Sequence, residues 1–132
     1  MSGFRCAIYN LIALGSILTS CAASVVNDAS VVDDASVADD AKDRLQQGKA
    51  IAFDRNKGNC LSCHMMDDGE LPGNSGPPLL MMQARFPERA TLREQIYDAN
   101  VRNPISVMPP YGRHHILSKT ELDLVVDYVH SL

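Results

Sequence analysis

The sequence lacks the features of a nucleic-acid-binding protein. Its 132 residues contain no Trp, and aromatic residues make up only 5% of the chain. From Leu45 onward, nine Lys and Arg residues stand against ten Asp and Glu residues, so no basic stripe is present. Without a basic surface or an aromatic platform for stacking bases, we expect no nucleic-acid partner. The overall net charge of −4 comes mainly from the residues before Leu45.

An apolar run long enough to span a bilayer comfortably is also missing at the start of the chain. The run from Ala7 to Leu18 is too short, and Arg5 is the only charged residue among the first twenty. This pattern predicts an export signal over residues 1–21, with an uncut membrane anchor as the alternative. We therefore expect the rest of the chain to be periplasmic.

The end of this signal resembles a bacterial lipobox. Its sequence is Leu18-Thr19-Ser20-Cys21, in which Cys21 would become the lipidated first residue of the mature protein. Ala22-Ala23 also permits ordinary signal cleavage. Lipidation of Cys21 would anchor the protein to a membrane surface.

Cysteine is scarce, with four residues in all and none after Cys63. The sequence from Cys60 to His64 is C-x-x-C-H, the attachment site of a c-type haem. Two thiols with this spacing can add to the two vinyl groups of one porphyrin, and His64 is then placed to bind the iron axially. We therefore expect one haem c, held by Cys60 and Cys63.

A C-x-x-C pair has two other common uses, a zinc site and a redox disulfide. A zinc site needs further ligands, but there is no second C-x-x-C, and the adjacent His114 and His115 are poorly spaced for one metal. A redox disulfide of the thioredoxin type needs a βαβ context, which is not visible. Because Cys6 would leave with the signal and Cys21 would carry lipid, no thiol remains for a structural disulfide.

A hexapeptide repeats three times over residues 23–40. Its copies are Ala-Ser-Val-Val-Asn-Asp, Ala-Ser-Val-Val-Asp-Asp and Ala-Ser-Val-Ala-Asp-Asp. A period of six matches neither a solenoid unit nor a helical face. The sequence therefore predicts a flexible acidic tether over residues 22–43, with docking to a basic partner as the alternative. One small domain follows over residues 44–132, with the porphyrin as the centre of its core.

We predict an all-α fold with three main helices and long loops rich in Gly and Pro. Apolar residues at helical spacing predict helices from Ala41 to about Arg55 and from Pro87 to about Ala99. A capping box, Ser118-Lys119-Thr120-Glu121, begins the last helix. Gly48 in the first helix predicts a close approach by another helix, with Tyr128 as its contact. The predicted buried stripe of the last helix is Leu122, Val125, Val126, Val129 and Leu132.

Two loops are expected to complete the haem site. In Gly76-Pro77-Pro78-Leu79, a carbonyl near Pro77 is our candidate to hold the second ring nitrogen of His64, and Leu79 would pack on the porphyrin. A plain surface loop is the alternative. Met108 is kept extended by the proline that follows it, and we predict that it is the second axial ligand. Its rivals are Met65 and Met66, which are too near His64 to reach the opposite face, Met81, Met82, His114 and His115.

From about Leu45 to Leu132, the sequence resembles SoxX, the small monohaem cytochrome subunit of the thiosulfate-oxidising SoxAX complex. The part from Met108 to Ser118 is the most specific, since C-x-x-C-H occurs in every c-type cytochrome. The segments that carry the resemblance are Gly58-Asn59-Cys60-Leu61-Ser62-Cys63-His64, Gly76-Pro77-Pro78-Leu79, Leu92-Arg93-Glu94-Gln95-Ile96-Tyr97-Asp98, Val107-Met108-Pro109-Pro110-Tyr111-Gly112-Arg113-His114 and Ile116-Leu117-Ser118.

The resemblance implies a class I cytochrome c fold and a role in sulfur oxidation. It implies a heterodimer with a SoxA-type cytochrome and transient contacts with a SoxYZ-type carrier and an acceptor cytochrome c. The complex would couple thiosulfate to a cysteine of the carrier, and the released electrons would pass through this haem. By the same resemblance, Cys60 and Cys63 hold the haem, and His64 and Met108 bind its iron. No thiol or open iron position is then left for catalysis, so the chain alone is an electron carrier.

Two other functional classes remain open at this stage. A free-standing or lipid-anchored small cytochrome c serving a terminal oxidase would form only transient, salt-sensitive encounters. A haem-based ligand sensor would need an open sixth iron position, so carbon monoxide binding by the ferrous protein tests it. A stable partner and an apolar patch at the haem edge would favour the complex subunit instead.

Overall fold

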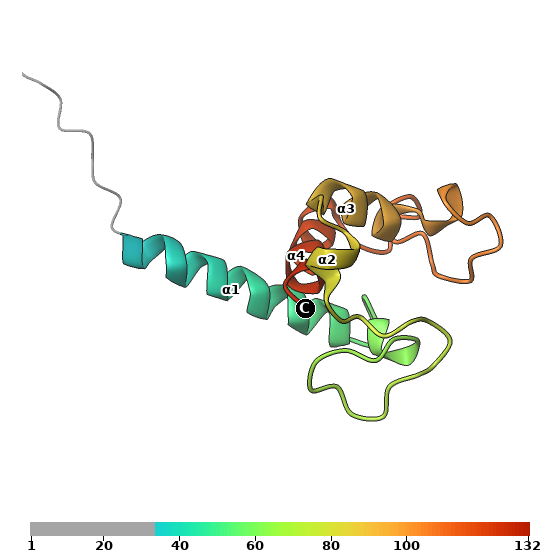
Figure 1. Ribbon diagram of the computed structural model, residues 1–132, viewed down its shortest axis with the longest axis horizontal. Helices are drawn as coiled ribbons and strands as arrows, with labels where there is room; N and C mark the ends of the chain where they lie inside the picture. Colours follow the sequence, from blue (N-terminus) through green and yellow to red (C-terminus); the bar gives the residue numbers. More distant parts are fainter. Residues whose placement is uncertain (1–33) are drawn as a thin grey trace, which may run out of the picture. The chain divides into compact units, whose positions relative to one another are not determined.

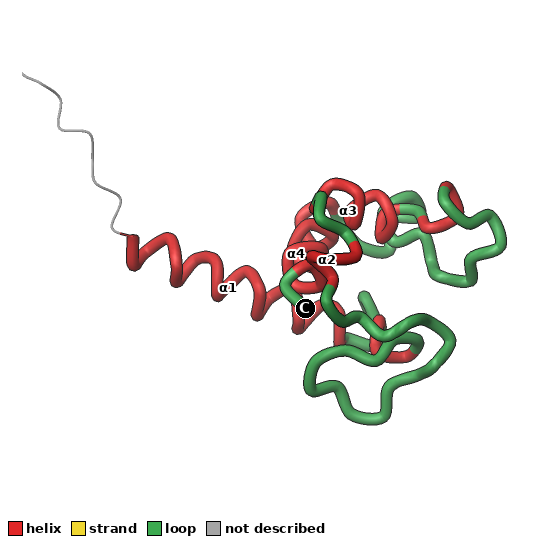
Figure 2. Tube along the Cα trace, viewed as in Figure 1, coloured by secondary structure: helices red, strands yellow, loops and turns green. Residues whose placement is uncertain are grey.

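The computed structural model describes residues 34–132, which form helices and loops without strands (Figures 1 and 2). The predicted all-α fold is confirmed. The predicted signal, Cys21 and the first part of the tether lie outside the described residues. In the described part, no helix is long and apolar enough to cross a membrane. The helices are α1 (Asp34–Phe53), the 3-10 turn η1 (Cys60–Ser62), α2 (Met82–Arg85), α3 (Arg89–Tyr97), the 3-10 turn η2 (Ala99–Val101) and α4 (Lys119–His130).

Helix α1 begins at Asp34, about two turns before the predicted start at Ala41. Residues 34–43, which the sequence assigns to the flexible tether, are therefore helical, and residues 37–44 are exposed. Alanine at every third position favours the helical state there, and extending a helix that is already formed adds one hydrogen bond per residue. Because residues 37–44 bury no face, no apolar periodicity indicates a helix there.

The crossing of α1 and α4 is centred on Gly48, as the sequence predicts. A Cβ atom built on Gly48 would lie 2.1 Å from the carbonyl oxygen of Leu124 and 2.8 Å from Cβ of Tyr128. The Tyr128 ring also packs edge-to-face on Phe53, with 6.4 Å between ring centroids. The absent side chain at residue 48 thus lets the two backbones touch.

Helix α4 is the centre of the core, with α1 and α3 packed on it. All of the predicted stripe residues within α4 are buried, and so are Leu92 and Ile96 of α3. These contacts follow from the 3.6-residue period of the apolar positions. The buried residues of α4 are Leu122, Leu124, Val125, Val126, Tyr128 and Val129.

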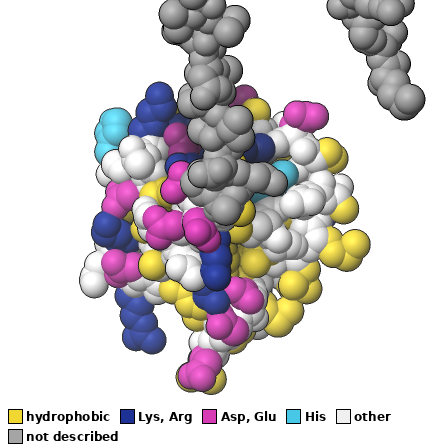
Figure 3. All heavy atoms as spheres, turned by 90° about the vertical axis from the view of Figure 1, so that its left-hand side faces the viewer, with side chains coloured by type: hydrophobic (Ala, Val, Ile, Leu, Met, Phe, Trp, Pro, Cys, Tyr) yellow, Lys and Arg dark blue, Asp and Glu magenta, His cyan; other side chains and the backbone are white. Residues whose placement is uncertain are grey.

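Ion pairs link α4 to α1 and α3 at the partly exposed sides of these helices. Asp127 of α4 pairs with Arg44 of α1 and Arg89 of α3, and Arg93 pairs with Asp123 at 2.6 Å. Although partial burial acts to raise it, hydrogen bonds from Arg89 and Arg44 hold the pKa of Asp127 below its usual value. On the face shown in Figure 3, basic and acidic side chains are accordingly intermixed.

The predicted capping box at the start of α4 is confirmed. The Ser118 hydroxyl accepts from the Glu121 backbone N–H, and the Glu121 carboxylate accepts from the Ser118 backbone N–H at 2.9 Å. Glu121 also pairs with Lys57, which follows α1. The hydrogen bond from Lys57, together with those from Ser118, lowers the pKa of Glu121 to about 2.

Helix α2 was not predicted, since the sequence from Met66 to Pro87 reads as irregular. Its four residues are held by tertiary contacts: the Met82 side chain is 1% exposed, and its backbone N–H donates to the Leu132 carbonyl at 3.2 Å. A helix this short is specified by what it packs against rather than by its own sequence.

Replacing Gly48 by Ala should destabilise the protein by about 2 kcal/mol, because the clash with the α4 backbone outweighs the gain of about 1 kcal/mol in helix propensity. Chemical denaturation followed by circular dichroism measures this loss. Gln46→Ala, at an exposed position of the same helix, is the control and should change stability little. Equal stability of G48A and wild type would contradict the close crossing.

Glu121→Gln should reduce the acid sensitivity of folding. Because its pKa is depressed in the folded state, Glu121 contributes stability above its unfolded pKa of about 4.3, and this stability is lost as the pH falls towards 2. Glutamine keeps the capping box but not the charge. Denaturation midpoints from pH 6 to about 3 should therefore fall less steeply in E121Q, whereas Glu94→Gln, at an exposed position of α3, should follow wild type.

Candidate functional site

The segment that contains Cys60, Cys63 and His64 turns back onto the end of α1. The Gly58 N–H donates to the Ile51 carbonyl at 3.1 Å, and Asn59 adopts a left-handed conformation with φ 47°. Asparagine tolerates this conformation better than most residues. The 3-10 turn η1 follows at once, and the His64 N–H donates to the Cys60 carbonyl at 2.9 Å. Local hydrogen bonds thus fix the two thiols and the imidazole relative to one another.

The His64 ring is held by the carbonyl predicted from the sequence. Its Nδ1 lies 2.7 Å from the Pro77 carbonyl oxygen, and because that oxygen can only accept, Nδ1 carries the proton. This leaves Nε2 as the atom free to bind a metal ion. A Cβ atom at Gly76 would lie 2.3 Å from Cε1 of the same ring, so glycine is required there.

Arg85 of α2 supports the same turn, which sequence reasoning missed. Its Nη1 donates to the Pro78 carbonyl at 2.7 Å, next to the peptide group that holds His64. A hydrogen bond from a guanidinium group is among the stronger ones in proteins. No local pattern indicates it, because Arg85 lies in the helix that was not predicted.

The loop before α4 brings Met108 to the site. The Met108 N–H donates to the Ser106 hydroxyl at 3.2 Å, and Pro109 follows. Three residues further on, the Tyr111 hydroxyl donates to the Gly58 carbonyl at 2.6 Å. Burial raises the pKa of Tyr111 to about 12, so this hydroxyl stays protonated near neutral pH. Sequence reasoning also missed Tyr111, whose only signal is its place after two prolines.

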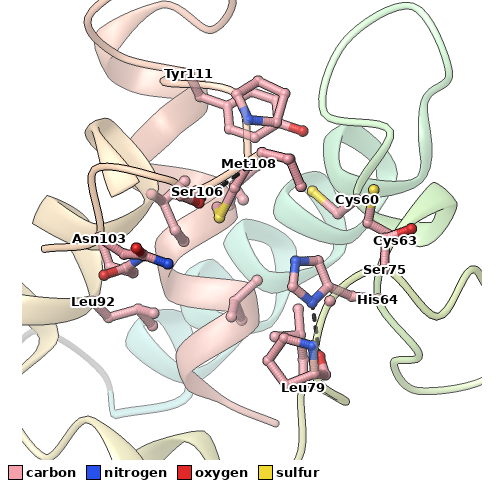
Figure 4. A pocket seen from close by; sticks show the side chains of 18 of the residues that line it. Cys60, Cys63, His64, Ser75, Leu79, Leu92, Asn103, Ser106, Met108 and Tyr111 are labelled. Atoms are coloured by element: carbon pink, nitrogen blue, oxygen red, sulfur yellow. Dashed lines mark hydrogen bonds between the residues drawn. The ribbon is translucent and has the colours of Figure 1, made fainter. Parts of the chain in front are cut away.

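All four predicted haem residues line one cavity of about 430 Å³, and Figure 4 shows Met108 and His64 on facing sides of it. Leu79 also lines it, as predicted. Of the rival ligands, Met82 lines the cavity as well, whereas His114 and His115 are exposed and outside the lining. The helices contribute the apolar residues Met82, Leu92, Ile96, Val125 and Val129.

The lining fits a covalently held haem. Two thiols stand beside an oriented imidazole, a thioether faces them, and most of the remaining wall is apolar; these are the groups that hold haem in a cytochrome c with His and Met ligands. Burial raises the pKa of the Cys60 thiol to about 11, so it is a neutral thiol near pH 7. Among residues 34–132, no three His, Cys, Asp or Glu side chains gather as ligands for one metal ion.

A helical domain built around such a cavity is a small c-type cytochrome. Consistent with this class, residues 43–129 match the family described as cytochrome c oxidase, cbb3-type, subunit III. The chain belongs to this family, so it carries a covalently bound haem c and its role is electron transfer. The match shows a c-type cytochrome and contains nothing specific to sulfur oxidation. A search of curated proteins gave no match.

Gly76→Ala should disturb the His64 ring, because the added methyl group would occupy the position next to Cε1. We expect a loss of about 1–3 kcal/mol of stability and shifted NMR resonances of the His64 ring protons. Gly69→Ala is the matched control in the same loop, since its methyl group would meet the flexible tip of Leu61 and, at 3.1 Å, the Met66 carbonyl oxygen, but not His64. Unchanged His64 resonances in G76A would contradict the tight contact.

Proposed function

We propose that this protein is the electron-transfer subunit of a SoxAX-type complex that couples thiosulfate to a cysteine of a carrier protein. In this proposal, Cys60 and Cys63 form thioethers to haem c, and His64 and Met108 bind its iron. When bound, haem c supplies one reversible electron at its iron. The chain's own residues orient the imidazole, exclude water and close both axial positions to substrate.

The observation that carries the proposal is an exposed apolar loop at the mouth of the cavity. Ile105 and Val107 line the cavity, yet their side chains are 87% and 83% exposed. Apolar residues next to a redox site are expected where another protein covers that site. The loop from Asn103 to Pro110 contains no charged residue, which favours a stable partner over a salt-dependent encounter.

The resemblance to SoxX supplies the identity of the partner. Its most specific part, Met108 to Ser118, begins at the predicted axial ligand and includes Tyr111, which anchors this loop to Gly58. The sulfur chemistry would belong to a SoxA-type subunit, because both thiols of the described part line the haem cavity. The chain would pass the released electrons to an acceptor cytochrome c.

The site of action proposed here is the periplasm. The export signal over residues 1–21 would deliver the chain there, and c-type haem is attached outside the cytoplasm. Lipidation of Cys21 would place the domain near a membrane surface. The segment that joins Cys21 to the domain is helical from Asp34 onward.

Co-purification tests this function. The full chain, tagged at its C-terminus, is expressed in its own host during growth on thiosulfate. We expect a stoichiometric second cytochrome to elute with it at moderate salt. Elution as a lone monohaem protein would contradict an obligate subunit.

The apolar loop gives a second arm of the test. The double variant Ile105→Glu/Val107→Glu should weaken binding of the second cytochrome by on the order of 30-fold, since apolar residues at an interface centre contribute about 2 kcal/mol or more. Leu71→Glu is the matched control, because Leu71 is 97% exposed but does not line the cavity. Equal weakening by both variants would contradict docking at the cavity mouth.

A second candidate function is electron delivery to a terminal oxidase. The family description, which names a subunit of a cytochrome c oxidase, favours it. The protein would then be a free-standing or lipid-anchored small cytochrome c. Purification as a monomer that reduces an oxidase in a salt-sensitive manner would support this candidate over the complex subunit.

A further inference from the structure

We infer that Tyr111 is a positioning residue for Met108, and that its hydrogen bond to the Gly58 carbonyl keeps the methionine over the cavity. The inference rests on the proposed role of Met108 as an axial ligand. Its basis is a contact between the two segments that would hold the haem from opposite sides. These segments lie far apart in the sequence and meet at one buried hydroxyl.

The Tyr111 side chain is placed to hold the Met108 loop against Gly58. Its side chain is 7% exposed, and its hydroxyl lies 2.6 Å from the Gly58 oxygen, 53 residues earlier in the chain. Pro109 and Pro110 are the only residues between Met108 and Tyr111. Each proline fixes its own φ and restricts the residue before it. A shift of Tyr111 is therefore expected to move Met108 as well.

The acceptor end of the link is equally fixed. Gly58 is buried, and its N–H donates to the Ile51 carbonyl of α1 at 3.1 Å. A Cβ atom there would lie 2.7 Å from the same oxygen, so Gly58 is packed directly on the helix. Cys60 follows two residues later. The Tyr111 hydroxyl therefore connects the Met108 loop to the start of the attachment segment and to α1.

The backbone of Tyr111 is held separately from its hydroxyl. Its carbonyl accepts from the Leu117 N–H at 3.1 Å, and the next residue, Gly112, donates to the Tyr97 carbonyl at 3.1 Å. Removing the hydroxyl therefore leaves the loop attached to the end of α3 and to Leu117, just before α4, but detached from Gly58. The predicted effect is a weaker bond from Met108 to iron in a domain that remains folded.

The experiment uses the full chain with its haem and the variant Tyr111→Phe, which keeps the buried ring. Imidazole is the probe, because it competes with a methionine for ferric iron. Loss of one buried hydrogen bond should raise the affinity of imidazole about tenfold. The charge-transfer band of methionine-bound ferric iron should also disappear at a lower denaturant concentration than the helical circular dichroism signal.

Tyr128→Phe is the matched control. The Tyr128 hydroxyl donates to an Asp67 carboxylate oxygen at 3.2 Å, and neither residue is hydrogen-bonded to the Met108 loop. Its loss should lower global stability without changing imidazole affinity. If Y111F binds imidazole no more tightly than wild type, the positioning role of Tyr111 is wrong.

A third variant separates this inference from the site assignment. Met108→Ala should abolish the charge-transfer band of the wild-type protein. If wild type lacks the band and M108A binds imidazole like wild type, Met108 is not a ligand, and both the assignment and the inference are overturned. If M108A abolishes the band but Y111F leaves band and affinity unchanged, only the role of Tyr111 is overturned.

Discussion

The contact between α1 and α4 at Gly48 is the constraint on which the haem cavity depends. The end of α1 leads into the segment with Cys60, and α4 supplies Val125 and Val129 to the lining. Since no side chain separates the two backbones at the crossing, their spacing is fixed. The loops then add the polar and sulfur-containing groups to a cavity whose apolar wall is already set by the helices.

Much of the chemistry of the site could be predicted because it is encoded locally. The Cys60–His64 motif and the capping box at Ser118 each span at most five consecutive residues. A glycine inside an amphipathic helix, as at Gly48, signals a close neighbour even when that neighbour is unknown. The Pro77 carbonyl, a candidate to hold the second nitrogen of His64, lies only 13 residues away in the sequence.

What could not be predicted depends on pairs of residues brought together only by the fold. No property of Tyr111 indicates which buried carbonyl its hydroxyl meets, and Arg85 contacts Pro78 from a helix that has no local pattern of its own. The start of α1 at Asp34 could not be predicted for another reason: an exposed helix needs no apolar stripe. The roles of Cys60 and Cys63 in haem attachment and of His64 and Met108 as iron ligands stay predictions, although all four line one cavity.

The distance in sequence between α1 and α4 has a consequence for the order of assembly. The thiols and the imidazole lie in one short segment near the middle of the chain, whereas Val125 and Val129 of the cavity wall belong to its last helix. Contacts between segments so far apart in the sequence form only after the intervening loop has closed, and that closure costs conformational entropy. During synthesis the attachment segment therefore precedes α4, and its two thiols exist before α4 can dock and complete the cavity wall.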